Sequence, residues 1–418
     1  MAESKLVIEG GHPLQGEIRI QGAKNSVLPL LSAVVLCDED VVLERCPALT
    51  DVYAASRILT HLGCRCSFRD GKMEIRNGGI SRSEIPEAMM HEMRSSITFL
   101  GPLLSRTGNC TLYLPGGCEL GPRPIDMHLH ALRQMGAEIH ETHGMLRLQG
   151  RLRGTDLYLP FPSVGATENI MLAAVLAQGR TRIHNAAREP EIRDLAEFLA
   201  ACGAKISGAG TDTVIIDGVE RLHGCVYRVM PDRIAAATYL SAVAAAGGSV
   251  CIQDCCPEDL TAVTEVLRQM GCRVYCHESR IYLQSSLPLH AAPYIRTMPH
   301  PGFPTDAQAL LMAAHCKARG SCMFEETIFD SRYRHVDDLI RMGADIRLSG
   351  RAAVVHGVQK LSGTTVHATD LRGGAAMLIA GLTAEGVTEL TELSHLDRGY
   401  EDPEGVLRSL GAKIERIT

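Results

Sequence analysis

The stretch "PEIRDLAEFLAACGAKI", residues 190–206, decides the fold, because it closes a helix and opens a strand within a few residues. Its opening Pro-Glu suits a first helical turn, and apolar residues then recur at helical spacing. Gly203 stands where a helix ends in a left-handed residue, and Ile206 can begin a strand. We therefore predict an outer amphipathic helix, a glycine cap and a strand.

The same ending occurs six times along the chain of 418 residues. Successive copies lie 67 to 73 residues apart, which indicates six copies of one unit of about 70 residues. The six glycines are Gly63, Gly136, Gly203, Gly271, Gly343 and Gly411. A repeat this regular predicts that all six units share the same arrangement of helices and strands.

A second helix, apolar on all sides, precedes each amphipathic one, as in "RIAAATYLSAVAAAG" at residues 233–247. Such helices are typical of a buried core. Short alternating stretches such as "CTLYLPG" and "DTVIIDGV" supply the strands. The units predict an α/β protein that forms either a continuous solenoid or two lobes of three units around a ligand cleft; composition does not decide between them.

Composition excludes several classes of function. The chain has 42 basic and 48 acidic residues and 4% aromatic residues, without blocks of like charge, which argues against nucleic-acid binding. It shows neither a leader pattern nor a run of 18 apolar residues, so we expect a cytoplasmic protein without membrane attachment. The 15 cysteines follow no disulfide or zinc pattern, which predicts free thiols and no metal.

Polar and charged residues stand just before the buried helices. They are Lys24, Asn25, Arg94, Thr167, Glu168, Asp232, Arg233, Asp306, Asp370 and Arg372. Helix amino termini favour anions, so cations repeated at this position indicate a multiply anionic ligand. The alternative is that each charge only caps its own unit. Asp306 in "PGFPTDAQALL" fits either a helix cap or a general base.

Eight motifs carry a family resemblance. They are "QGAKNSVLPLL", "MRSSITFLGPLL", "PGGCELGPRPIDMHL", "PSVGAT", "AAREPEI", "HPGFPTDAQ", "TDLRGGAA" and "SHLDRGYE". From about Ile8 to the carboxyl terminus the chain resembles the enolpyruvyl transferases. The resemblance implies a two-lobed inside-out α/β barrel of six β-α-β-α-β-β repeats, three per lobe. Lobe I would comprise 1–22 plus 230–418, lobe II would comprise 23–229 with a cysteine lid loop at about 112–123, and the active site would lie in the cleft between them.

The resemblance also implies an activity. The enzyme would transfer the enolpyruvyl group of phosphoenolpyruvate to the 3′-hydroxyl of UDP-N-acetylglucosamine through a tetrahedral ketal, releasing phosphate. This reaction is the first committed step of bacterial peptidoglycan synthesis, and fosfomycin inhibits it by linking to the loop cysteine. The resemblance implies neither a metal nor an organic cofactor, because phosphoenolpyruvate carries its own leaving group. The oligomeric state is not indicated.

Site residues carry over from the family motifs. Lys24, Arg123 and Arg398 would hold the phosphate and carboxylate of phosphoenolpyruvate, and Asn25 and Arg94 would help fix the nucleotide sugar. The remaining contacts would come from Arg123, Pro124, Ile125, Asp126 and Met127 around uridine, from Phe161, Pro162, Ser163 and Val164 around the diphosphate and uracil, and from Ile328 and Asp370 near the sugar. Asp306 would accept the hydroxyl proton, while Lys24 and the arginines would stabilise developing charge.

Cys118 has two possible roles in that reaction, proton donation to C3 or assistance to product release. Three neighbouring glycines permit a mobile loop, and the nearby Arg123 favours a thiolate. The alternative is an incidental thiol, since free cysteine often behaves as a small hydrophobe. The chain departs from some family members at Phe161 and Ala48, where they have lysines, which leaves the diphosphate contacts open.

Two other functions compete with this prediction. The sister enzyme that makes 5-enolpyruvylshikimate 3-phosphate shares the fold, but it lacks the cysteine loop and usually has Lys-Ser in place of Lys24-Asn25. A non-catalytic paralogue that binds nucleotide sugar is the second, because fold does not guarantee chemistry. The presence of Lys24, Cys118, Asp306 and Arg398 argues against it.

Overall fold

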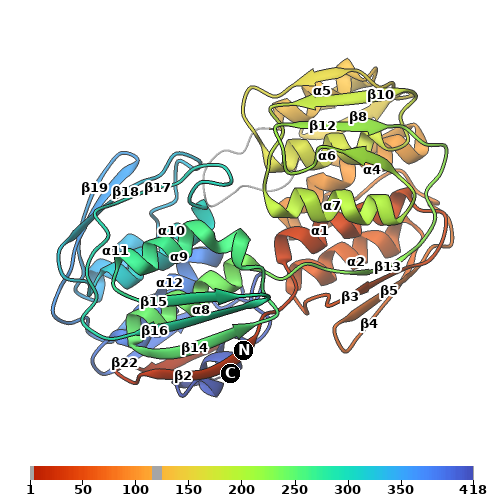
Figure 1. The fold of residues 1–418 in the computed structure, drawn as a ribbon. Coiled ribbons are helices and arrows are strands. Elements are labelled where there is room, and N and C mark those ends of the chain that lie inside the picture. Colours follow the sequence, from red (N-terminus) through yellow and green to blue (C-terminus); the bar gives the residue numbers. More distant parts are fainter. Residues whose placement is uncertain (1–3, 115–124, 418) are drawn as a thin grey trace. The chain divides into compact units, whose positions relative to one another are not determined.

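The computed structural model describes residues 4–114 and 125–417, which divide into two compact units (Figure 1). Unit 1 contains residues 4–21 and 231–417, and unit 2 contains residues 22–114 and 125–230. Each unit is built around its own cluster of buried apolar side chains. The chain leaves unit 1 after Gln21 and returns to it after Met230.

The six predicted glycine caps are confirmed. Their φ angles lie between 97° and 122°, a region that side chains with a Cβ rarely adopt. In each cap the amide after the glycine donates to the carbonyl five residues earlier at 2.9 or 3.0 Å, as from Ala204 to Leu199. This Schellman pattern satisfies helix carbonyls that would otherwise lack donors and turns the chain directly into the next strand.

Nearly apolar helices form the centre of unit 2. They are α1 (Lys24–Ala33), α4 (Leu100–Thr107) and α6 (Val164–Ala174), joined by the 3₁₀ helices η1 (Val34–Leu36) and η2 (Arg94–Phe99). Helix α4 packs on α6, and both 3₁₀ helices contact α1 and α4. The amphipathic helices are α2 (Thr50–Leu62), α5 (Asp126–Gln134) and α7 (Pro190–Ala201), with the short α3 (Glu87–Glu92) beside them.

Three sheets belong to unit 2. Their orders are β13-β3-β5-β4, β6-β8-β7 and β11-β12-β10-β9. The strands are β3 (Val41–Glu44), β4 (Arg65–Arg69), β5 (Lys72–Arg76), β6 (Asn109–Tyr113), β7 (Glu138–Thr142), β8 (Met145–Gln149), β9 (Asp156–Tyr158), β10 (Arg180–His184), β11 (Lys205–Ser207), β12 (Thr213–Asp217) and β13 (Val226–Arg228). In the three-stranded sheet, a single parallel bridge between Glu84 and Thr111 stands where the other sheets have their fourth strand.

Unit 1 repeats the arrangement with three helices that all pack on one another (Figure 1). They are α8 (Arg233–Ala246), α10 (Thr305–His315) and α12 (Leu371–Thr383). Nearly every residue of the three is buried, as their apolar sequences predict. Around them lie η3 (Pro257–Leu260), α9 (Thr261–Gln269), α11 (Val336–Arg341) and α13 (Pro403–Ser409).

The sheets of unit 1 have four strands each. Their orders are β15-β16-β14-β2, β17-β18-β20-β19 and β21-β22-β1-β23. The strands are β1 (Lys5–Glu9), β2 (Leu14–Arg19), β14 (Gly248–Gln253), β15 (Arg273–His277), β16 (Arg280–Ser285), β17 (Tyr294–Arg296), β18 (Ser321–Glu325), β19 (Asp345–Ser349), β20 (Ala352–His356), β21 (Thr365–His367), β22 (Val387–Thr391) and β23 (Lys413–Ile417).

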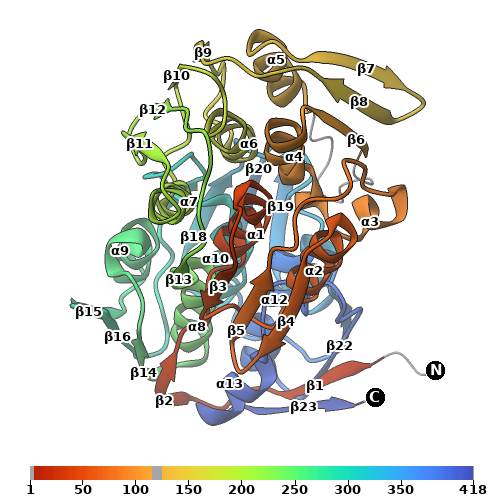
Figure 2. The same ribbon diagram turned by 90° about the vertical axis from the view of Figure 1, so that its right-hand side faces the viewer.

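Strand exchange distinguishes the fold from six independent repeats. Strand β2 precedes α1 in sequence but pairs in parallel with β14, and β13 precedes α8 but pairs in parallel with β3. Strand β1 lies between β22 and β23 and is antiparallel to both, as Figure 2 shows for β1 and β23 near the two termini. The first and last strands of the chain therefore complete one sheet.

The predicted fold class is confirmed: this is an α/β protein in which buried helices are surrounded by sheets, with three repeats in each unit. The repeat β9-α6-β10-α7-β11-β12 has the predicted β-α-β-α-β-β order. Among residues 4–114 and 125–417, no helix combines the length and apolar character needed to cross a membrane.

Candidate active site

Three predicted site residues, Cys118, Arg123 and Pro124, lie outside the described residues. The others fall into two sets, one in each unit. Lys24, Asn25, Arg94, 125–127 and 161–164 belong to unit 2, and Asp306, Ile328, Asp370 and Arg398 belong to unit 1.

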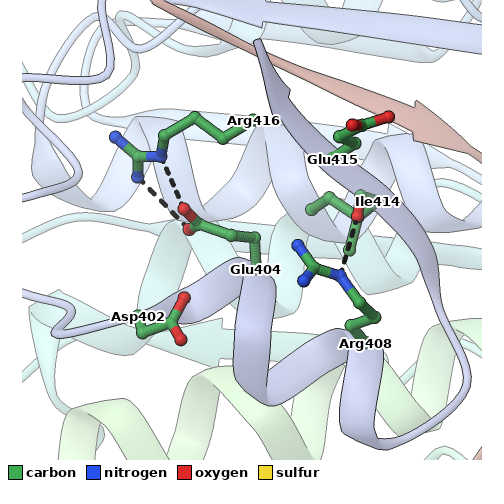
Figure 3. A pocket seen from close by; sticks show the side chains of 6 residues that line it. All are labelled: Asp402, Glu404, Arg408, Ile414, Glu415 and Arg416. Atoms are coloured by element: carbon green, nitrogen blue, oxygen red, sulfur yellow. Dashed lines mark hydrogen bonds and ion pairs between the residues drawn. The ribbon is translucent and has the colours of Figure 1, made fainter. Parts of the chain in front are cut away.

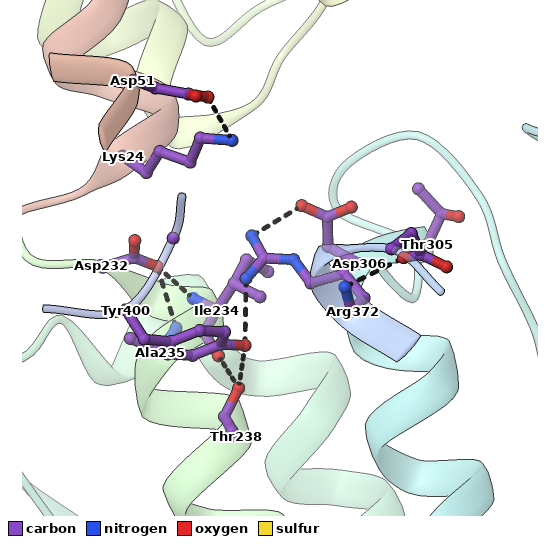
Figure 4. Close-up of polar contacts among 12 residues, drawn as sticks. Lys24, Asp51, Asp232, Ile234, Ala235, Thr238, Thr305, Asp306, Arg372 and Tyr400 are labelled. Atoms are coloured by element: carbon purple, nitrogen blue, oxygen red, sulfur yellow. Dashed lines mark hydrogen bonds and ion pairs between the residues drawn. The ribbon is translucent and has the colours of Figure 1, made fainter. Parts of the chain in front are cut away.

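Lys24 is the first residue of α1 and is paired with a carboxylate. Its Nζ lies 3.0 Å from Oδ2 of Asp51, which is almost fully buried in the first turn of α2 (Figure 4). Two positions later, Ser26 donates to the buried carboxylate of Asp194 on α7, which also accepts from the Tyr227 hydroxyl at 2.7 Å. These contacts fix the start of α1, and with it Lys24 and the exposed Asn25.

Two buried side chains of unit 2, His128 on α5 and Asn169 on α6, are hydrogen-bonded to each other. Asn169 Nδ2 donates to His128 Nδ1 at 2.9 Å and to the Ile97 carbonyl at 3.0 Å, and its Oδ1 accepts from the Gly101 amide at 2.8 Å. These bonds link α5, α6, η2 and α4. Burial and the charge of Arg94 lower the pKa of His128 to about 4, so the imidazole is neutral at pH 7.

The loop before α6 presents the predicted 161–164 stretch. Ser163 caps the helix by accepting from the Ala166 amide at 3.4 Å, and Thr167 donates to the Ser163 carbonyl at 2.8 Å. Phe161 is 41% exposed, like several other large apolar side chains of the protein. One turn into the helix, Glu168 is buried, and burial together with nearby acids raises its pKa well above the ordinary range.

Asp306 in unit 1 is held by two buried arginines. Its Oδ1 accepts from Arg332 Nη2 at 2.7 Å and its Oδ2 accepts from Arg372 Nη2 at 3.0 Å. The two arginine side chains are 2% and 4% exposed, whereas the Asp306 side chain is 25% exposed. The paired charges favour the carboxylate form, and its exposure leaves it accessible to a hydroxyl group.

Capping therefore does not explain Asp306, which is the second residue of α10, after a Pro304 N-cap that lacks a side-chain cap bond. Asp232 and Asp370 are true caps: each accepts from two backbone amides at the start of its helix, between 2.8 and 3.1 Å. The second oxygen of Asp370 is buried without a hydrogen-bond partner. In Asp370, capping therefore occupies one carboxylate oxygen, whereas in Asp306 the two arginines occupy both.

Arg372 connects Asp306 to a hydroxyl pair. Its Nη1 donates to the Tyr400 hydroxyl at 3.1 Å, and that hydroxyl lies 2.7 Å from Thr238 Oγ1 (Figure 4). Because Thr238 donates to the Ile234 carbonyl, the Tyr400 hydroxyl donates to Thr238. Burial is the largest influence on Arg372 and opposes its charge, but Asp306, Tyr400 and Asp232 together outweigh burial, so the pKa of Arg372 is raised.

Ile328 lies in a loop fastened by one buried carboxylate. Glu326 Oε1 accepts from the amides of Ile328 and Phe329 at 2.8 and 3.1 Å, and Oε2 accepts from Thr305 Oγ1 at 3.0 Å. Thr305 directly precedes Asp306. The loop that contains Ile328 and the start of α10 are therefore held in register by Glu326.

Two of the cavities among the described residues do not gather the predicted set. One of about 500 Å³ in unit 1 is lined by Asp402, Glu404, Arg408, Ile414, Glu415 and Arg416, and its two arginines are bonded to protein oxygens (Figure 3). Another of about 380 Å³ in unit 2 includes only Asp126 and Met127 of the predicted residues.

The described part of the chain contains neither a disulfide nor a candidate metal site. All 14 cysteines there are free thiols, and burial raises the pKa of Cys316 and Cys322 to about 12. Within the same residues, no group of three or more His, Cys, Asp or Glu side chains is arranged to hold a metal ion.

The structure adds residues that the sequence did not single out: Asp51, Arg332, Glu326 and Tyr400. Asp51 lies 27 positions from Lys24, and Arg332 lies 26 from Asp306. Glu326 lies 21 from Thr305, and Tyr400 lies 28 from Arg372, so local spacing contains no signal for these four contacts. Only the folded arrangement brings them into contact.

Comparison with known proteins defines the class. A family model described as EPSP synthase (3-phosphoshikimate 1-carboxyvinyltransferase) matches residues 8–407. The solved enolpyruvyl transferase NikO from Streptomyces tendae superposes with a TM-score of 0.89 at 25% identity, covering 100% of this chain and 99% of NikO. EPSP synthase from Acinetobacter baumannii shares the fold, with a TM-score of 0.76 at 19% identity and complete coverage of both chains. The chain belongs to this family of carboxyvinyl, or enolpyruvyl, transferases.

Within the family, the chain is similar to UDP-N-acetylglucosamine 1-carboxyvinyltransferases. It is 46% identical over 414 residues to UDP-N-acetylglucosamine 1-carboxyvinyltransferase 2 of Caldanaerobacter subterraneus subsp. tengcongensis. It is 47% identical over 416 residues to UDP-N-acetylglucosamine 1-carboxyvinyltransferase of Oleidesulfovibrio alaskensis. Both alignments cover 99% of this chain and 99% of the relative.

Proposed function

We propose that this chain transfers the enolpyruvyl group of phosphoenolpyruvate to the 3′-hydroxyl of UDP-N-acetylglucosamine and releases phosphate. The observation that carries the proposal is 46 to 47% identity, along almost the whole chain, to relatives named for this reaction. In a bacterial cell the reaction commits UDP-N-acetylglucosamine to peptidoglycan synthesis. Both substrates are charged metabolites, so we place the reaction in the cytoplasm.

The proposed chemistry requires one base and one acid. The 3′-hydroxyl attacks C2 of phosphoenolpyruvate and gives its proton to the accessible carboxylate of Asp306, while C3 gains a proton and becomes a methyl group. The resulting tetrahedral ketal then loses a proton from that methyl carbon and expels phosphate, which restores the double bond. Cys118 serves either as the proton donor to C3 or in product release.

Binding residues come from both units in this proposal. Lys24, Arg123 and Arg398 hold the phosphate and carboxylate of phosphoenolpyruvate, and Asn25 and Arg94 fix the nucleotide sugar. Residues 123–127 and 161–164 contact uridine and diphosphate, and Ile328 and Asp370 lie beside the sugar. The pairing of Lys24 with Asp51 supports a binding role, because a phosphate can replace or share that carboxylate.

Asp306 is supported as the base by its surroundings. Arg332 and Arg372 hold both carboxylate oxygens in place, so one orientation is selected before substrate binds. The same arginines supply positive charge near the reacting atoms, where the ketal and the departing phosphate develop negative charge.

An acceptor-dependent phosphate assay tests the proposal. Purified protein with phosphoenolpyruvate should release phosphate on addition of UDP-N-acetylglucosamine and not on addition of shikimate 3-phosphate. Turnover with shikimate 3-phosphate alone would identify the sister activity. Binding of the nucleotide sugar without phosphate release would identify a non-catalytic paralogue.

A further inference from the structure

The segment that contains Arg398 has no regular secondary structure to hold it. Residues 393–399 form turns, and Arg398 is half-buried within them. Its guanidinium can meet a small anion reproducibly only if the backbone on both sides is fixed, since each misplaced ångström weakens an oriented contact. The anchors of this segment therefore matter to the site.

The residue before Arg398 is held by the chain's last strand. Arg416 on β23 donates from Nη2 and Nη1 to the two carboxylate oxygens of Asp397, at 2.8 and 3.0 Å. The same guanidinium donates from Nε to Glu404 at 2.5 Å (Figure 3). A bidentate pair of this kind fixes direction as well as distance.

The residues after Arg398 are tied to the start of the chain by the amide side chain of Gln21, in addition to the Gly399 and Tyr400 amides donating to the Leu396 carbonyl. Gln21 Nε2 donates to the Gly399 carbonyl at 3.0 Å, and Gln21 Oε1 accepts from the Glu401 amide at 3.1 Å. These two bonds lie on either side of Tyr400, the buried residue whose hydroxyl contacts Arg372. One side chain thus clamps the backbone next to Arg398 and next to the network around Asp306.

Gln21 is itself rigidly supported. Its carbonyl accepts from the Asp232 amide at 3.0 Å, and the preceding Ile20 amide donates to the Gln253 carbonyl at 3.2 Å. It follows β2, whose six residues pair with β14. The clamp therefore stands on a sheet and on the start of α8, not on another loop.

We propose that Gln21 is a positioning residue for Arg398: its amide fixes the 399–401 backbone so that the Arg398 guanidinium meets the anionic groups of phosphoenolpyruvate. The inference rests on the proposed function, which assigns Arg398 to that substrate. The clamp needs a donor and an acceptor on one side chain, facing a carbonyl and an N–H group respectively. Glutamine meets this need, and an ionised glutamate does not.

The glutamate variant makes the test specific. In Gln21→Glu one oxygen still accepts from Glu401, but at pH 8 the other is a carboxylate oxygen facing the Gly399 carbonyl. An ordinary glutamate has a pKa of about 4.3, and a facing carbonyl oxygen raises it. Towards pH 5 a growing fraction of this carboxyl group is protonated and can donate to the Gly399 carbonyl. The variant therefore regains both hydrogen bonds to the 399–401 backbone at low pH.

The measured quantity is KM for phosphoenolpyruvate at saturating UDP-N-acetylglucosamine, as a ratio to the unaltered protein at each pH from 5 to 8. For Gln21→Glu we expect a KM ratio of about ten at pH 8 and a smaller ratio at pH 5. For Gln21→Ala we expect a raised KM ratio that is the same at every pH. Gln15→Glu on exposed β2 makes the same charge change away from the clamp and should give a ratio near one. Binding of UDP-N-acetylglucosamine, measured by calorimetry, should be unchanged in all three and shows that each is folded.

Arg398→Ala separates this inference from the proposed function. If Arg398→Ala raises KM for phosphoenolpyruvate but both Gln21 variants stay within twofold of the unaltered protein, the positioning role is wrong and the binding role stands. A Gln21→Glu ratio that does not fall at low pH also overturns the proposed clamp. If Arg398→Ala has no effect on KM, the assignment of Arg398 to phosphoenolpyruvate fails.

Discussion

Replacing Asp306 with asparagine tests the proposed base directly. The neutral amide keeps one oxygen that can accept from Arg332 or Arg372 and turns an NH₂ group towards the other, so both ion pairs are lost and one hydrogen bond remains. Removing one partner of a fully buried pair costs about 3 to 5 kcal/mol. Because the Asp306 side chain is 25% exposed, we expect a smaller loss of unfolding free energy, about 1 to 3 kcal/mol. The amide cannot take a proton, so turnover should fall about 10²- to 10⁴-fold.

Phosphate release at saturating substrates measures the turnover of Asp306→Asn, urea unfolding measures its stability, and calorimetry measures binding of UDP-N-acetylglucosamine. Asp330→Asn is the matched control, because it also removes an aspartate from an arginine pair, but an exposed one with Arg351. The control should keep nearly full turnover. A turnover of Asp306→Asn within tenfold of the unaltered protein, with the nucleotide sugar still bound, would show that another group accepts the proton.

Three further predictions concern reactivity, acid stability and the glycine caps. Fosfomycin should add once, at Cys118, because deeply buried thiols such as Cys316 are kept protonated by a pKa raised to about 12; peptide mapping after inactivation that found Cys118 unmodified would contradict this. The pKa of His315 is lowered by burial to about 4 from 6.5, so the unfolded chain binds the proton first, and the contribution of His315 to the unfolding free energy should fall by about 3 kcal/mol from pH 6.5 to 4. The buried His128 and His335, whose pKa values are lowered in the same way, add to this loss. Urea titrations should show a shallower loss in His315→Gln. Gly271→Ala should lower the unfolding free energy by about 1 to 2 kcal/mol through its φ of 97° alone. Gly63→Ala should lower it more, since the added Cβ would lie 2.6 Å from a backbone oxygen. Equal shifts of the melting temperature in the two variants would refute the distinction.

The repeat could be predicted from sequence because its determinants are local. A glycine after an amphipathic helix, an apolar residue two or three positions later and an all-apolar second helix specify their own turns whatever surrounds them. The sequence pattern likewise placed Lys24 and Asp306 just before buried helices, and they are the first residue of α1 and the second residue of α10. The sequence alone leaves two roles open for Asp306, because a helix cap and a general base can occupy the same position.

Long-range pairing settled what spacing left open. Tertiary structure joined β1 to β22 and β23, exchanged β2 and β13 between the two units, and put Arg332 and Arg372 on the two oxygens of Asp306. It also placed Gln21 against Gly399, 378 positions away. By itself the sequence determined the repeats, their caps and the residue types available for chemistry, since these depend on neighbours along the chain. Which carboxylate is paired with buried arginines, and which turn is bonded to Gln21, depends on contacts between distant residues, and only the folded chain decides those.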